Sequence, residues 1–98
     1  MRKRARKDDN QTIIVSAFRQ FGASVFETHQ IGGGFPDIVV GFRGKNYLIE
    51  IKDGEKCESR RPLTPAEIEF HAAWHGRVEI IKSVEEVTAF MRRVSCER

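Results

Sequence analysis

The first part of the chain repeats apolar residues with the period of an α-helix. Apolar positions return every three or four residues between residue 13 and Gly22. They are Ile13, Ile14, Ala17, Phe18 and Phe21. Aspartate and asparagine at residues 8–10 can cap the N-terminus of such a helix, and glycine commonly ends one. The pattern predicts an amphipathic first helix.

Three short apolar runs follow, each with the length of a β-strand. We expect strands over residues 23–28, 37–42 and 47–52. The glycines at 32–34 interrupt the chain before the second run. Residues 43–46, Arg-Gly-Lys-Asn, have turn chemistry, so they predict a four-residue hairpin loop between the second and third strands.

The second half of the chain begins with the signature of a helix start. Thr64 and Glu67 have the spacing of a capping box, and Pro65 stands at the first helical position. We expect this second helix to end near Trp74. An apolar run at residues 77–81 predicts a fourth strand.

A last helix completes the predicted order of helix, three strands, helix, strand and helix. Ser83 and Glu86 repeat the capping-box spacing, and apolar residues continue at helical spacing through Val94. Parallel strands of one sheet are normally joined by a right-handed crossover, so the second helix is expected to connect the third strand to a parallel fourth. We therefore predict an α/β fold with a mixed four-stranded sheet flanked by helices.

The composition describes one small domain with a basic end. Of the 98 residues, 40% are apolar and 32% are charged, and the formal net charge is +3. Five basic residues lie in the first seven positions, so the rest of the chain has a net charge of −2. We divide the chain into a basic arm, residues 1–9, and a single domain, residues 10–95. The arm either attracts a polyanion such as nucleic acid or is a solvated end.

The sequence predicts a cytoplasmic protein with no membrane partner. No apolar run is long enough to span a bilayer, and the first apolar cluster is shorter than the hydrophobic segment of a signal peptide. Cys57 and Cys96 have neither the spacing of a metal site nor a secretory context, so both are interpreted as reduced thiols.

A charged cluster is predicted on one face of the hairpin. With a loop of residues 43–46, Asp37 pairs with Lys52 on the opposite strand, and Glu50 lies diagonally across from Asp37. The other face of the hairpin is wholly apolar and should pack on the core. It consists of Ile38, Val40, Phe42, Tyr47, Ile49 and Ile51.

The cluster has two interpretations. In one, Lys52 and Asp37 form a cross-strand ion pair at the margin of the sheet. In the other, two carboxylates and a backbone carbonyl hold a hard divalent cation while Lys52 stabilises charge on a phosphate. The geometry alone leaves both open. The spacing favours the second, because twelve residues separate Asp37 from the string Glu50-Ile51-Lys52.

The residues around the cluster resemble the PD-(D/E)XK nuclease superfamily and, more closely, its VRR-Nuc branch. The resemblance rests on residues 34–41, GFPDIVVG, on residues 48–54, LIEIKDG, and on a Leu-Thr-Pro helix start at residues 63–65. It spans about residues 10 to 90. The minimal core of the superfamily also has the same order of helices and strands.

The resemblance implies a divalent-metal-dependent DNA nuclease. Asp37, Glu50 and the carbonyl of Ile51 would bind Mg²⁺ or Mn²⁺, and Lys52 would orient the nucleophile or stabilise the transition state. Stand-alone, phage-type members are similar in architecture to Holliday junction resolvases. We therefore expect a homodimer that cuts branched DNA such as four-way junctions, in the host cytoplasm if a phage encodes it. The apolar surfaces of the first and last helices are the expected interface.

Further residues are expected to contact DNA or to assist the site. The candidates for phosphate contacts are Arg2, Lys3 and Arg4 in the arm, Gly33 and Gly34 in the glycine stretch, and Arg60 and Arg61 in the charged loop. The superfamily often places a glutamate on the first helix, where this chain offers Gln11, with Glu27 as a second accessory candidate. Relatives in the branch commonly carry glutamine where this chain has Glu67. The capping box explains Glu67 without a catalytic role.

Two other functions compete with a stand-alone nuclease. One is a non-catalytic nucleic-acid-binding module, and the other is a nuclease subunit of a larger phage replication or recombination complex. His71 and His75 have the spacing of zinc ligands, but without a third ligand they are interpreted as a solvent-facing pair. Trp74 is interpreted as helix core rather than as a platform for stacking bases.

Overall fold

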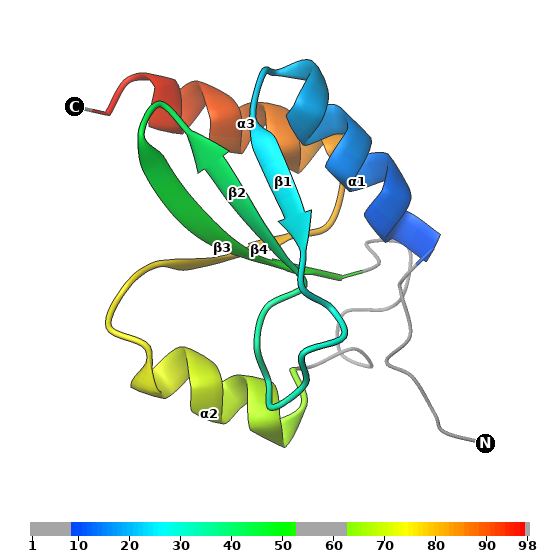
Figure 1. Ribbon diagram of the computed structural model, residues 1–98, viewed down its shortest axis with the longest axis vertical. Coiled ribbons are helices and arrows are strands. Elements are labelled where there is room, and N and C mark those ends of the chain that lie inside the picture. The colour runs from blue at the N-terminus through cyan, green and yellow to red at the C-terminus, as the bar shows by residue number, and fades with distance from the viewer. Residues whose placement is uncertain (1–8, 53–62, 98) are drawn as a thin grey trace.

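The computed structural model describes residues 9–52 and 63–97, and its elements follow the predicted order (Figure 1). They are α1 (Asp9–Gln20), β1 (Ser24–Glu27), β2 (Ile38–Phe42), β3 (Lys45–Ile51), α2 (Pro65–Ala73), β4 (Val78–Ile81) and α3 (Val84–Ser95). The strands form one sheet in the order β1-β2-β3-β4. The first three strands are antiparallel and β4 is parallel to β3, which confirms the predicted mixed sheet.

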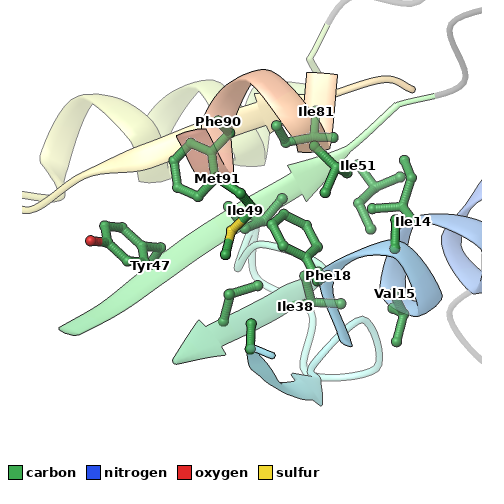
Figure 2. Close-up of a cluster of buried hydrophobic side chains, with 14 of the residues drawn as sticks. Ile14, Val15, Phe18, Ile38, Tyr47, Ile49, Ile51, Ile81, Phe90 and Met91 are labelled. Carbon is green, nitrogen blue, oxygen red and sulfur yellow. The ribbon is translucent and has the colours of Figure 1, made fainter. Parts of the chain in front are cut away.

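The core lies between the sheet and the pair of helices α1 and α3. Phe18 of α1 meets Phe90 of α3 edge to face, with 6.1 Å between ring centroids, and Tyr47 of β3 meets the same Phe90 ring at 5.3 Å. Figure 2 shows these side chains closing around Ile49 and Met91. The predicted apolar face of the hairpin is confirmed, since all of its residues are buried except for the half-buried Phe42.

Most of the apolar surface of α1 and α3 is buried against the sheet. Ile14, Phe18, Val87 and Phe90 are at most 1% exposed. Ile13 of α1 and Val84 of α3 remain exposed, at 56% and 38%, so only a small apolar surface of these helices is open to a partner. No helix within residues 9–52 and 63–97 is long and apolar enough to cross a bilayer.

The hairpin between β2 and β3 turns more tightly than predicted. Only Arg43 and Gly44 form the turn, with φ angles of 54° and 79°, and Phe42 pairs with Lys45. Two positive φ angles are typical of the two-residue turn whose twist matches the strands, and Gly44 adopts one without strain. The four-residue loop was therefore wrong, and the register is shifted by two residues. A shift of two leaves the faces of the strands unchanged.

Helix α2 lies apart from the other two helices, on the opposite side of the sheet (Figure 1). None of its residues is buried, and Trp74, which caps its C-terminus, is 44% exposed. The interpretation of Trp74 as helix core was wrong, because its ring stacks on Phe70 at the surface of the domain. The interpretation of His71 and His75 as a solvent-facing pair holds for the exposed His75 only, because His71 is half-buried with its Nε2 atom buried, and α2 ends at Ala73, between the two.

The loop before β2 packs closely against helix α2. Gly34 has a φ angle of 82° and approaches α2 so closely that a Cβ would overlap the carbonyl oxygen of Ala66. Phe35 meets Phe70 edge to face at 5.4 Å between centroids. This close packing explains why residue 34 is glycine. It also fixes α2 against the segment that leads into Asp37.

Candidate active site

Asp37 and Glu50 lie opposite each other on neighbouring strands. The shifted register pairs Ile38 with Ile49, and continuing it by one residue places Asp37 across from Glu50 rather than Lys52. The Oδ2 atom of Asp37 accepts a hydrogen bond of 2.8 Å from the backbone N–H of Ile51. The backbone N–H of Asp37 donates to the carbonyl of Ile49 at 3.0 Å. The two carboxylates are thus closer neighbours than the sequence predicted.

Glu50 is a buried carboxyl group whose charged form the surroundings oppose. The residue is 2% exposed, and its Oε1 atom has no hydrogen-bond partner in the part of the chain that the structure describes. Burial, and then the nearby charge of Asp37 and the contacts with Glu67, raise the pKa of Glu50 to about 9. A cation beside these oxygens would favour the carboxylate and satisfy the unpaired atom.

The ammonium of Lys52 lies between two glutamates. Its Nζ atom donates to Oε1 of Glu67 at 3.0 Å and lies 3.6 Å from Oε2 of Glu50. Burial alone would lower the pKa of Lys52, but the hydrogen bond to Glu67 and the neighbouring carboxylates outweigh it, so the pKa is raised. Lys52 is therefore a fixed positive charge at the end of β3.

Two polar residues that sequence reasoning missed hold the ends of these strands. Asn10 donates from Nδ2 to the carbonyls of Lys52, at 3.0 Å, and Lys82, at 2.8 Å. Thr28 donates from its backbone N–H to the carbonyl of Asp37 at 2.7 Å, and from Oγ1 to the carbonyl of Pro36 at 2.8 Å. From the sequence, Asn10 is explained as a possible helix cap, so its bond to the carbonyl of Lys52 could not be predicted.

The accessory candidates Gln11 and Glu27 contact each other. The buried Gln11 donates from Nε2 to Oε1 of Glu27 at 2.8 Å and lies 3.2 Å from Nδ1 of His29. Glu27 pairs with Ile38, whose side chain is in the core, so Glu27 lies on the helix-covered face of the sheet. Asp37 and Glu50 lie on the other face. Gln11 and Glu27 thus lie together on the face of the sheet opposite to that of the two carboxylates.

The donor set of the site suits a hard cation with few protein ligands. Within the described ranges, no group of three or more histidine, cysteine, aspartate or glutamate side chains could hold a metal ion. Asp37, Glu50 and the carbonyl of Ile51 would leave several positions for water, as is usual for Mg²⁺. The unpartnered oxygen of Glu50 and its raised pKa fit such an ion.

Comparison with known proteins identifies the fold. No protein-family model matches the sequence, and no curated protein matches it. A solved structure described as a VRR_NUC domain superposes with a TM-score of 0.63 at 22% sequence identity, over 84% of this chain and 89% of that one. The chain has the VRR-Nuc fold. The match confirms the α/β architecture, with a mixed four-stranded sheet flanked by helices, that the motifs implied.

The structure describes only some of the residues that the sequence predicted to contact DNA. Arg2, Lys3, Arg4, Arg60 and Arg61 lie outside the described residues. A Cβ added at Gly33 would meet no atom within 4 Å, whereas Gly34 packs against α2. Glu67, explained from the sequence by its capping box alone, belongs to the charged cluster. The glutamine common at this position in the branch was the signal that could have found it.

Proposed function

We propose that the protein is a divalent-metal-dependent nuclease that hydrolyses phosphodiester bonds in DNA. The observation that carries the proposal is the buried, unpartnered oxygen of Glu50 beside Asp37, with the ammonium of Lys52 at 3.6 Å from the same carboxyl group. A structural ion pair would not need a second acid whose charge the fold opposes. A metal ion would balance both carboxylates.

Each residue then has a defined role. Asp37, Glu50 and the carbonyl of Ile51 would bind Mg²⁺ or Mn²⁺, which when bound acidifies water and screens the phosphate. The ammonium of Lys52 would stabilise charge that develops on the phosphate oxygens. Asn10 fixes the backbone of Lys52 through its carbonyl, so the lysine begins from a rigid point.

Branched DNA is the proposed substrate, and a homodimer is the proposed assembly. A domain of 98 residues offers a small surface for duplex DNA, and the five positive charges of the arm supply an attraction for phosphate that is independent of sequence. Two copies related by a two-fold axis would match the symmetry of a four-way junction. Light scattering on the active protein should give about twice the 11.3 kDa of one chain, and a monomer with full junction activity would disprove the dimer.

The proposed activity has a direct test. Purified protein is incubated with supercoiled, linear and four-way-junction DNA, with and without Mg²⁺ or Mn²⁺. We expect metal-dependent cleavage that Asp37→Asn abolishes, because asparagine keeps an acceptor for the N–H of Ile51 but lacks the charge that binds the ion. Glu79→Gln is the matched control, since Glu79 pairs with Arg77 and Arg93 at the surface. Metal-independent DNA binding without cleavage would favour the non-catalytic module.

A further inference from the structure

One oxygen atom of Glu67 joins helix α2 to the charged cluster. Oε1 accepts the backbone N–H of Thr64 at 2.9 Å, which is one half of the capping box, and it also accepts Nζ of Lys52 at 3.0 Å. The other half of the box, from the N–H of Glu67 to Oγ1 of Thr64, is 3.1 Å long. The carboxylate is thereby fixed by its own helix before it meets the lysine.

Capping alone does not require this lysine, as helix α3 shows. Glu86 occupies the same position after Ser83, and its Oε1 accepts a backbone N–H from Lys82 at 2.8 Å. Its N–H donates to Oγ of Ser83 as in α2. No ion pair of Glu86 with a lysine ammonium is found among the described residues. The second bond of Glu67 therefore belongs to the site and not to the cap.

The surroundings make the contact between Glu67 and Lys52 tight. The side chains are 18% and 13% exposed, respectively, so water screens the pair weakly. Burial raises the pKa of Glu67, but the backbone bond from Thr64 and the contacts with Lys52 and Glu50 outweigh burial and lower it. An ammonium on a flexible four-carbon stem needs such a partner to adopt a single position.

We propose that Glu67 is the positioning residue for Lys52. Its carboxylate orients the ammonium at the end of β3, and because α2 rests on the loop that leads into Asp37, the lysine and the metal-binding aspartate share one support. The contacts with Glu67 and Glu50 use at most two of the three ammonium protons, and another remains for a phosphate oxygen or water. The catalytic meaning of this role rests on the proposed nuclease function, but the geometric role does not.

The geometric role is tested without DNA or metal. ¹⁵N NMR of lysine ammonium groups reports how ordered each one is, and Lys52→Met assigns the signal of Lys52. We expect Glu67→Ala to abolish the ordered Lys52 signal and Glu67→Gln, which keeps an acceptor oxygen, to retain part of it. Glu86→Ala is the matched control, because it removes an equivalent cap and should leave the Lys52 signal unchanged. An ordered Lys52 in Glu67→Ala would overturn the proposal.

The catalytic role is tested by a double-mutant cycle on single-turnover cleavage. Glu67→Ala should slow cleavage by about 10- to 100-fold, as loss of a residue that orients another usually does, with Glu67→Gln in between and Glu86→Ala near wild type. In a Lys52→Met background, Glu67→Ala should cause no further loss, because its effect passes through the lysine. If the rate losses caused by Glu67→Ala and Lys52→Met multiply, Glu67 does not act through Lys52 and the positioning role is disproved. An inactive wild type would defeat the nuclease function, while the NMR result would still decide the positioning.

Discussion

At the scale of single residues, the site is organised around the buried carboxyl group of Glu50, whose pKa burial and the nearby acids raise to about 9. Sequence spacing identified Asp37, Glu50 and Lys52 as a group, because alternation along two strands fixes which side chains share a face. It could not reveal that Glu50 is 2% exposed or that Glu67 reaches Lys52, because both depend on where α2 packs. The capping box by itself explains a glutamate at position 67, so the sequence analysis assigned Glu67 no role in the site.

Glu50 should make the stability of the metal-free protein depend on pH. Its pKa is raised from 4.5 to about 9, so the folded state holds a proton that the unfolded state has lost. The free energy of unfolding should therefore decrease as pH rises from about 4.5 to about 9. Glu50→Gln should flatten this decrease and stabilise the protein at pH 8, as measured by urea unfolding. Parallel pH profiles of variant and wild type would show that Glu50 is not protonated in the folded state.

Lys52 should act on the transition state more than on binding. Lys52→Met should lower the single-turnover cleavage rate by a factor on the order of hundreds, the usual loss when one fixed donor is removed from a developing charge. Affinity for uncut DNA, measured in Ca²⁺, should change little because one phosphate contact among many is lost. Lys45→Met, at the exposed start of β3, is the control. Equal cleavage rates for Lys52→Met and wild type would remove Lys52 from the mechanism.

At the scale of elements, patterns of apolar residues together with capping boxes predicted every described helix and strand, whereas the length of the hairpin turn was predicted wrongly. Lys45 and Asn46 have the composition of a loop, yet they pair with β2 because Arg43 and Gly44 both adopt positive φ. A bulky residue rarely adopts that conformation, so a two-residue turn was not the obvious choice. The error left the core face intact, because loops of two and four residues give the same parity.

Gly34 should control the placement of α2. In Gly34→Ala, a new Cβ would overlap the backbone of Ala66, so the helix must move and carry Glu67 with it. Gly33→Ala is the matched control, because residue 33 also has positive φ but has open space around it. Fluorescence of Trp74, the single tryptophan, should change in the first variant and not in the second. The same response in both would mean that only backbone strain matters, at about 1–3 kcal/mol for a residue held in that region.

At the scale of the whole molecule, charge is divided unevenly along the chain. Residues 1–7 of the arm hold five positive charges while residues 8–98 sum to −2, so the domain by itself gains little long-range attraction to DNA. In the proposed mechanism, a bound metal ion would supply positive charge locally, and the arm would supply it at a distance. DNA affinity would then depend mainly on the arm, and catalysis would depend on the domain.

Deleting residues 1–7 should separate these two contributions. Affinity for DNA should fall, and the slope of log affinity against log salt should flatten because fewer counterions are released. The single-turnover rate at saturating DNA should stay near that of the full chain, since no candidate catalytic residue is removed. An unchanged salt slope in a binding titration would show that the arm does not contact phosphate.

The surface position of α2 has a thermodynamic consequence. A helix with no buried residue contributes little to the cooperative core, so its amide hydrogens should exchange through a local opening that leaves β2 and β3 protected. Such an opening would carry Glu67 away from Lys52 while the sheet still holds Asp37 beside Glu50. On heating, cleavage should then stop before the domain melts. Loss of cleavage, rather than unfolding of the domain, would then set the upper working temperature of the protein.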